Sequence, residues 1–118
     1  MTNARRGEIR AELDGQIYTL CLTLGALAEL EHAFQADDLV ALVRRFESAE
    51  LSARDLTRLI GAGLRGAGNQ ISDQQVADMS VADGVPGFIR IVTALLSATF
   101  GGDTPLDKPK NPQVPQDI

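Results

Sequence analysis

Aromatic residues are scarce in this sequence, and the scarcity limits the kind of core that it can build. Tryptophan is absent and aromatics make up only 4% of the chain, whereas hydrophobic residues reach 44%. The core must therefore be aliphatic, which suits packed helices better than a β-sandwich, whose strands favour aromatic and β-branched side chains. A chain of 118 residues is long enough for one domain with a core and too short for two of ordinary size.

Positive charge, cysteine and long apolar runs are lacking as well. The net charge is −5, so the sequence does not predict the basic face that binds nucleic acid or an anionic membrane. The lone Cys21 cannot form an internal disulfide, and no stretch approaches the length of a membrane span. No apolar run follows the basic residues near the start, as it would in a secretory signal. The sequence therefore predicts a soluble cytoplasmic protein.

The pair Asp14-Gly15 predicts an N-terminal β-hairpin. Asp-Gly is preferred in two-residue hairpin turns because both central positions need positive φ. The turn sets the cross-strand pairs, which are Leu13 with Gln16, Ala11 with Tyr18, and Ile9 with Leu20. Side chains alternate along a strand, so one face is apolar and the other is mostly polar. The apolar face carries Ile9, Ala11, Leu13, Tyr18, Leu20 and Leu22, and the other carries Arg10, Glu12, Ile17 and Thr19.

Capping residues and apolar spacing predict helices along the remainder of the chain. The helix starts are marked by Thr23, by Asp37 or Asp38, by Ser52 with Asp55, by Ser72 with Gln75, and by Pro86 in a first turn. The side chains expected to face the core are Leu27, Leu30, Phe34, Leu39, Leu42, Val43, Phe46, Leu56, Leu59, Ile60, Leu64, Val76, Met79, Phe88, Ile91, Val92, Leu95, Leu96 and Phe100.

The last of these helices is expected to stop at Gly101-Gly102. It is apolar over most of its circumference, which predicts a place at the centre of the bundle. The fold class is therefore α+β and mostly α, with an N-terminal two-stranded β-hairpin followed by a bundle of about five helices over residues 1–102. Proline recurs from Asp103 onward and bulky aliphatics are few, which predicts a disordered tail at residues 103–118.

The sequence holds one motif that imitates a nucleotide site. Gly61, Gly63 and Gly66 match G-x-G-x-x-G, but they follow a helical pattern, whereas a dinucleotide site needs them directly after a strand. We expect close packing of helices at Gly61 and Gly63, and a helix end near Gly66 or Gly68.

The remaining polar candidates have ordinary structural interpretations. His32 lacks the further ligands of a metal site, so we expect it at the surface. Cys21 is either a small buried hydrophobe or a partly covered thiol. The pairs Asp37-Asp38 and Arg44-Arg45, together with Glu47, are expected to face solvent. No catalytic, cofactor-binding or metal-binding residue is assigned, no cofactor is expected, and the chain is not expected to be an enzyme.

Several stretches carry a family resemblance. They are residues 6–15, residues 19–31 with the sequence TLCLTLGALAELE, and residues 38–42, 51–55 and 61–66. Together they resemble a small protein encoded in the tail-gene cluster of alphaproteobacterial gene transfer agents, which are phage-like particles that package cellular DNA. The likeness covers most of residues 6–79. That family has been labelled a tail tube protein and is also grouped with phage tail assembly chaperones.

The resemblance implies a role in tail assembly. A tail tube subunit usually contributes a substantial β-sheet to a closed ring, whereas this sequence predicts two strands, so we favour a chaperone that binds the tape-measure protein or another tail protein. Such a protein needs an exposed apolar groove, or an apolar face that opens. A structural tail tube component and a small regulatory binding module are the alternatives, and homo-oligomer formation stays open.

Overall fold

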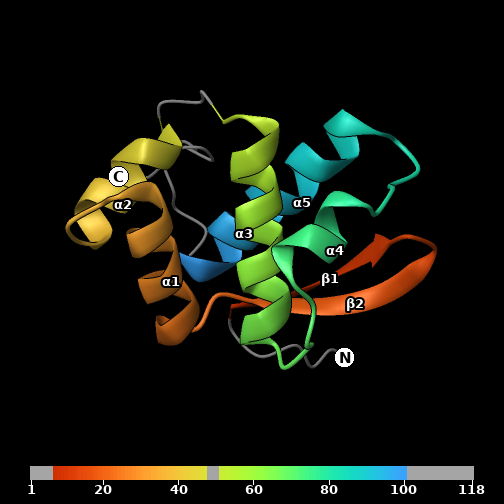
Figure 1. Ribbon diagram of the computed structural model, residues 1–118, viewed down its shortest axis with the longest axis horizontal. Helices are drawn as coiled ribbons and strands as arrows, with labels where there is room; N and C mark the ends of the chain where they lie inside the picture. Colours follow the sequence, from red (N-terminus) through yellow and green to blue (C-terminus); the bar gives the residue numbers. More distant parts are fainter. Residues whose placement is uncertain (1–6, 48–50, 101–118) are drawn as a thin grey trace, which may run out of the picture.

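The computed structural model describes residues 7–47 and 51–100. The described elements are β1 (Glu8–Leu13), β2 (Gln16–Cys21), α1 (Leu24–Phe34), α2 (Leu39–Glu47), α3 (Ala53–Gly66), α4 (Asp73–Ala77) and α5 (Val85–Thr99) (Figure 1). A two-stranded hairpin followed by five helices confirms the predicted α+β, mostly α, class. The predicted tail at residues 103–118 and the helix stop at Gly101-Gly102 lie outside the described residues.

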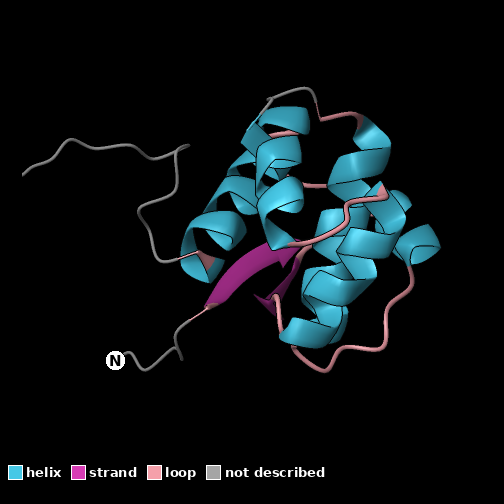
Figure 2. Cartoon of the chain, turned by 90° about the vertical axis from the view of Figure 1, so that its left-hand side faces the viewer, coloured by secondary structure: helices cyan, strands magenta, loops and turns pink. Residues whose placement is uncertain are grey.

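The hairpin has the predicted turn and register. Asp14 and Gly15 have φ angles of 56° and 82°, as a two-residue turn requires. The three predicted pairs are confirmed within the antiparallel β1–β2 register. Leu13 and Leu20 on the apolar face are fully buried, whereas Ile17 on the opposite face is exposed. The hairpin thus lies against the helices by one face only (Figure 2).

Side-chain caps begin four of the helices as predicted. Thr23 Oγ1 accepts a hydrogen bond from the Ala26 N–H at 3.1 Å. Asp38 Oδ1 accepts one from the Ala41 N–H at 2.9 Å, so Asp38 rather than Asp37 caps α2. Complete capping boxes begin α3 at Ser52 and α4 at Ser72. These bonds satisfy backbone donors that a helix start leaves unpaired.

The prediction that the last helix occupies the centre is wrong. The central helix is α3, which contacts β2, α1, α4 and α5 (Figure 1). One face of α5 stays outside the core, because Val85 is 61% exposed and Ile89 is 48% exposed. The residues Gly61-Ala62-Gly63 are small enough for neighbours to approach α3 from several sides, and hydrophobicity alone does not register that property.

Three smaller differences concern individual side chains. Leu39 was expected in the core but is 39% exposed, because α2 packs against α1 and needs only the narrow stripe of Leu42 and Phe46. Met79 follows the end of α4 and is half-buried. Arg45 was expected to face solvent, and its side chain is 40% exposed, but its guanidinium also lies over the Phe34 ring, 5.6 Å from the centroid.

The glycines of α3 are packing positions, as predicted for Gly61 and Gly63. A Cβ at Gly63 would lie 2.8 Å from Leu95 Cδ2, and one at Gly66 would collide with the Cys21 carbonyl oxygen. A Cβ at Gly61 would collide with the Asp73 carboxylate at the start of α4. Gly66 is the last residue of α3. The motif therefore allows β2, α4 and α5 to approach one helix closely.

Candidate partner-binding site

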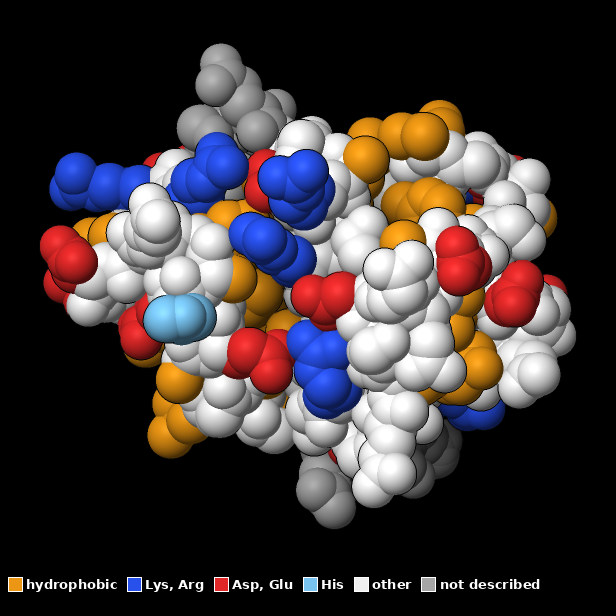
Figure 3. All heavy atoms as spheres, in the orientation of Figure 1, with side chains coloured by type: hydrophobic (Ala, Val, Ile, Leu, Met, Phe, Trp, Pro, Cys, Tyr) orange, Lys and Arg blue, Asp and Glu red, His pale blue; other side chains and the backbone are white. Residues whose placement is uncertain are grey.

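An apolar groove runs between α3, α4 and the first half of α5. We call it the α3–α5 groove. It has a volume of about 260 Å³ and is lined mainly by aliphatic and aromatic side chains, among them Leu56, Ile60, Val76, Met79, Val85, Phe88 and Ile89. Figure 3 shows hydrophobic side chains gathered over this part of the molecule, where α4 and the start of α5 lie. The groove is therefore the main candidate for binding another protein.

Local sequence explains why the groove is open. α4 has only five residues, so it covers a short length of α3. Gly84 precedes α5 with a φ of 68°, and Val85 and Ile89 then stand one helical turn apart on its exposed face. Val92, farther along α5, is buried. The helix thus turns one apolar stripe to the core and leaves a second beside the groove.

The other exposed aliphatic side chains do not line this groove. Ile17, Leu24, Leu39 and Val40 are exposed on the hairpin, α1 and α2. Single exposed apolar residues are ordinary on soluble proteins, whereas exposed apolar residues beside an apolar groove indicate a contact surface. Val85 and Ile89 meet that description.

A second hollow is polar and lies beside the start of α3. Its walls include Arg45, Arg54 and Arg58. Figure 3 shows basic side chains gathered where α2 and the start of α3 lie. Arg45 Nη2 lies 3.1 Å from Asp55 Oδ2, and the Asp55 side chain is only 8% exposed. The same carboxylate oxygen accepts a hydrogen bond from the Ser52 N–H at 3.0 Å. Asp55 therefore joins the capping box to α2, a role that the sequence pattern predicted only in part.

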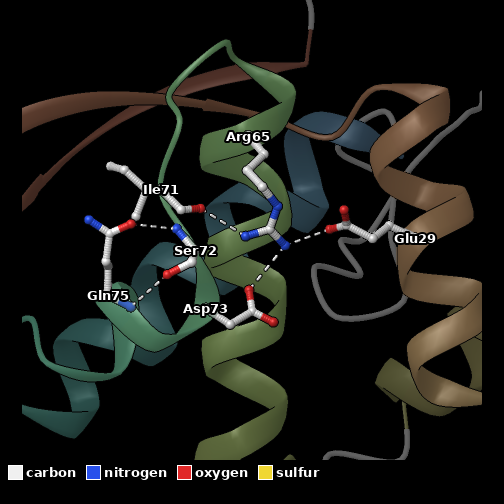
Figure 4. A network of polar contacts seen from close by, with 6 residues as sticks. All are labelled: Glu29, Arg65, Ile71, Ser72, Asp73 and Gln75. Atoms are coloured by element: carbon white, nitrogen blue, oxygen red, sulfur yellow. Dashed lines mark hydrogen bonds and ion pairs between the residues drawn. The ribbon is translucent and has the colours of Figure 1, made fainter.

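A polar network fixes α4 beside α3. Arg65 donates from Nη2 to Glu29 Oε1 at 2.6 Å and from Nη1 to the Ile71 carbonyl oxygen at 2.9 Å (Figure 4). Its Nη2 also forms an ion pair with Asp73 Oδ1 at 3.0 Å. The hydrogen bond to Glu29 raises the pKa of Arg65, partial burial opposes the rise, and Asp73 adds to it. The network links α1, α3 and α4.

Sequence reasoning missed this network because its members are far apart in the chain. Glu29 and Arg65 are 36 positions apart, and no local pattern joins them. The one sign of this contact in the sequence is Gly61, since a glycine in a helix interior indicates that another element packs closely there, and that element is α4. By holding α4 in place, the network shapes one wall of the α3–α5 groove.

The residues considered for metal or thiol chemistry lie apart. His32 is exposed on α1, and Cys21 is a half-buried cysteine at the end of β2. Within residues 7–47 and 51–100, no three His, Cys, Asp or Glu side chains form a group that could hold a metal ion. None of the helices in the same ranges is long and apolar enough to cross a membrane.

Comparison with known protein families matches residues 6–102 to the family described as "Phage tail tube protein, GTA-gp10". This range covers most of the chain, so the protein belongs to that family. The match confirms the resemblance to a gene transfer agent tail-cluster protein and supports a role in phage-like tails. No curated protein and no solved structure matched the chain significantly.

Proposed function

From this family membership, we propose that the protein acts during assembly of a phage-like tail as a chaperone that binds an apolar helical segment of another tail protein. The tape-measure protein is the expected partner. The observation that carries the proposal is the α3–α5 groove, whose rim holds the exposed side chains of Val85 and Ile89. No catalytic step, cofactor or nucleic-acid ligand is part of the proposal.

The groove suits a helix-in-groove mode of binding. An amphipathic helix presents apolar side chains at intervals of three and four residues, and Val85 and Ile89 have the matching interval of one turn. Covering each of these half-exposed side chains would contribute roughly 1 kcal/mol. Such a contact would shield an apolar segment of the partner until the tail is built.

A structural tail tube subunit is the second candidate, and the family description supports it directly. A tube ring is usually closed by a continuous β-sheet, to which the described residues of this chain would bring two strands. A small regulatory binding module could use the same groove, but the family membership does not favour it.

Co-expression tests the proposed chaperone role. The tape-measure protein from the same gene cluster is produced alone, with the wild-type chain, and with the double variant Val85→Ser and Ile89→Ser. We expect the wild-type chain to keep the partner in the soluble fraction and the double variant to lose most of that effect. The matched control is Leu24→Ser with Val40→Ser, since both residues are exposed aliphatics away from the groove.

Unchanged partner solubility with the wild-type chain would contradict the chaperone role. Equal loss in the groove variant and in the matched control would show that general surface hydrophobicity, rather than the groove, causes the effect. Thermal unfolding of both double variants checks that each is folded. We expect unfolding temperatures close to that of the wild type, because substitutions at exposed positions usually change the free energy of unfolding by less than about 0.5 kcal/mol each.

A further inference from the structure

The polar hollow beside the start of α3 adjoins the α3–α5 groove. We call it the arginine hollow, because Arg45, Arg54 and Arg58 line it. The hollow and the groove share Ala53, in the first turn of α3, as a lining residue. In Figure 3 basic side chains lie on one side of the start of α3 and hydrophobic side chains lie on the other. A segment that crosses the start of α3 would therefore contact both surfaces.

The walls of the arginine hollow carry an excess of positive charge. Three arginines and one aspartate line it, although the chain as a whole has a net charge of −5. The aspartate, Asp55, is already bound by the Ser52 N–H and by Arg45. Among the described residues, no carboxylate forms an ion pair with Arg54 or Arg58. The charge of these two guanidinium groups is therefore available to a ligand.

Arg58 is held in position within the hollow. The residue is half-buried, and its Nη1 donates to the Ala33 carbonyl oxygen, in the last turn of α1, at 3.2 Å. A guanidinium has several N–H donors, so the others can bind a carboxylate. An arginine that is already positioned loses less conformational entropy when it binds. Arg54 is exposed and lies one turn earlier on the same face of α3.

Carboxylates of a protein partner suit this hollow better than nucleic acid does. Arginine binds planar carboxylates through paired hydrogen bonds. A surface that binds DNA instead needs many cations along its length, and the net charge of −5 opposes such binding. An amphipathic helix can supply both of the required surfaces, because its apolar and its acidic side chains lie on different faces.

We propose that the helical segment bound in the α3–α5 groove carries Asp or Glu side chains beside its apolar stripe, and that Arg54 and Arg58 bind these carboxylates. This inference rests on the proposed function and adds the acidic character of the partner segment. Charge pairs at the edge of an interface mainly increase the association rate and fix the orientation of the partner. The arginine hollow thus determines which apolar helices bind and in which direction they lie.

Peptides that together span the tape-measure protein of the same gene cluster test this pairing. Each peptide has about 20 residues, which allows several helical turns, and its binding to the full chain is measured by fluorescence anisotropy. We expect the tightest peptides to combine an apolar stripe with Asp or Glu residues. The double variant Arg54→Glu with Arg58→Gln should bind them at least about tenfold more weakly. Added salt should weaken binding to the wild type more than binding to this variant.

The matched control is Arg10→Glu with Arg44→Gln. It makes the same change of charge at two exposed positions that line neither the hollow nor the groove, and it should bind the peptides as the wild type does. In a second control, Lys replaces the acidic residues of the tightest peptide. This change should weaken binding to the wild type and strengthen binding to the arginine variant.

The results separate a failure of this inference from a failure of the proposed function. Peptides that bind the arginine variant as tightly as the wild type, but not Val85→Ser with Ile89→Ser, would overturn the inference and leave the groove as the binding site. If no tape-measure peptide bound the wild type, the proposed function would fail, and this inference with it. A DNA duplex that bound the wild type but not the arginine variant, while the peptides bound both equally, would assign the hollow to nucleic acid instead.

Discussion

The two halves of α3 have opposite kinds of surroundings. Its second half carries Gly61, Gly63 and Gly66, and main-chain or side-chain atoms of β2, α4 and α5 approach these glycines so closely that a methyl group would not fit. Its first half carries Leu56 and Ile60, which form the floor of a groove whose rim is partly exposed. The glycine half leaves no room for a ligand, whereas the groove beside the aliphatic half has an exposed apolar rim on α5 that another molecule can cover.

This difference separates the packed positions of α3, which determine stability, from the exposed groove rim on α5, which is available for binding. Close-packed positions tolerate little added volume, because interiors are packed as densely as organic crystals. Rim positions contribute little to folding, since they stay in water in the free chain. We therefore expect substitutions at the glycine half to lower the free energy of unfolding, most strongly where a main-chain atom is in the way, and substitutions at the groove rim to impair binding while the fold is kept.

The largest effect is expected for Gly66→Ala. The new methyl group would meet the Cys21 carbonyl oxygen, a main-chain atom that cannot rotate away, and we expect a loss of about 3 kcal/mol in the free energy of unfolding. Urea denaturation measures it. Gly25→Ala in α1 is the matched control, because its nearest foreign atom would be Thr23 Oγ1 at 3.8 Å. The control should be neutral or slightly stabilised, and equal losses in both variants would contradict the packing difference.

A smaller loss is expected for Asp55→Ala at the start of α3. This change removes the acceptor of the Ser52 N–H and the ion pair with Arg45, and should cost about 2 kcal/mol. Arg54→Ala, one position earlier and exposed, is the control and should change stability by less than about 0.5 kcal/mol. If urea denaturation gave similar values for the two, the capping box would not anchor the first half of α3.

Arg65→Met should cost about 1 kcal/mol, because partly exposed ion pairs are weakened by water. The folded-state pKa of Arg65 is raised, so its contribution is present at all pH values below the unfolded-state pKa and is lost only in strong alkali. Salt is therefore the useful variable. Added salt should destabilise the wild type more than the variant in thermal unfolding, and identical salt dependence would contradict a contribution from this network.

The smallest effect on stability is expected for Val85→Ala at the groove rim. The side chain is 61% exposed, so the loss should be under about 0.5 kcal/mol by urea denaturation. Ile60→Ala on the floor of the same groove is the contrasting variant, since Ile60 is 1% exposed, and it should lose about 3 kcal/mol. A large loss at Val85 would show that the rim belongs to the core.

Local patterns predicted much of this fold, because the deciding interactions lie within a few residues of one another. Asp14-Gly15 gave the register of the hairpin, and Thr23, Ser52 and Ser72 marked helix starts that the structure confirms. Each of these features depends on a turn or a cap, whose geometry is set by the residues beside it.

The central place of α3 and the polar contacts could not be read in the same way. α5 is the more apolar helix by sequence, but small residues, rather than hydrophobicity, let several neighbours surround α3. Asp55 with Arg45, and Arg65 with Glu29, meet only after the helices have packed. The groove itself could be expected only as a general requirement of the proposed function, since Leu56 and Val85 come from elements far apart in the sequence.

Quantitative mass spectrometry of purified tail-bearing particles tests the central claim most directly. A chaperone that binds the tape-measure protein through the α3–α5 groove leaves when the tail is complete. We therefore predict that this chain is absent from mature particles, or strongly depleted relative to the tail proteins, while it is abundant in lysates of producing cells. Its presence in mature particles in proportion to the tail tube would contradict the chaperone role and identify the chain as a structural tail component.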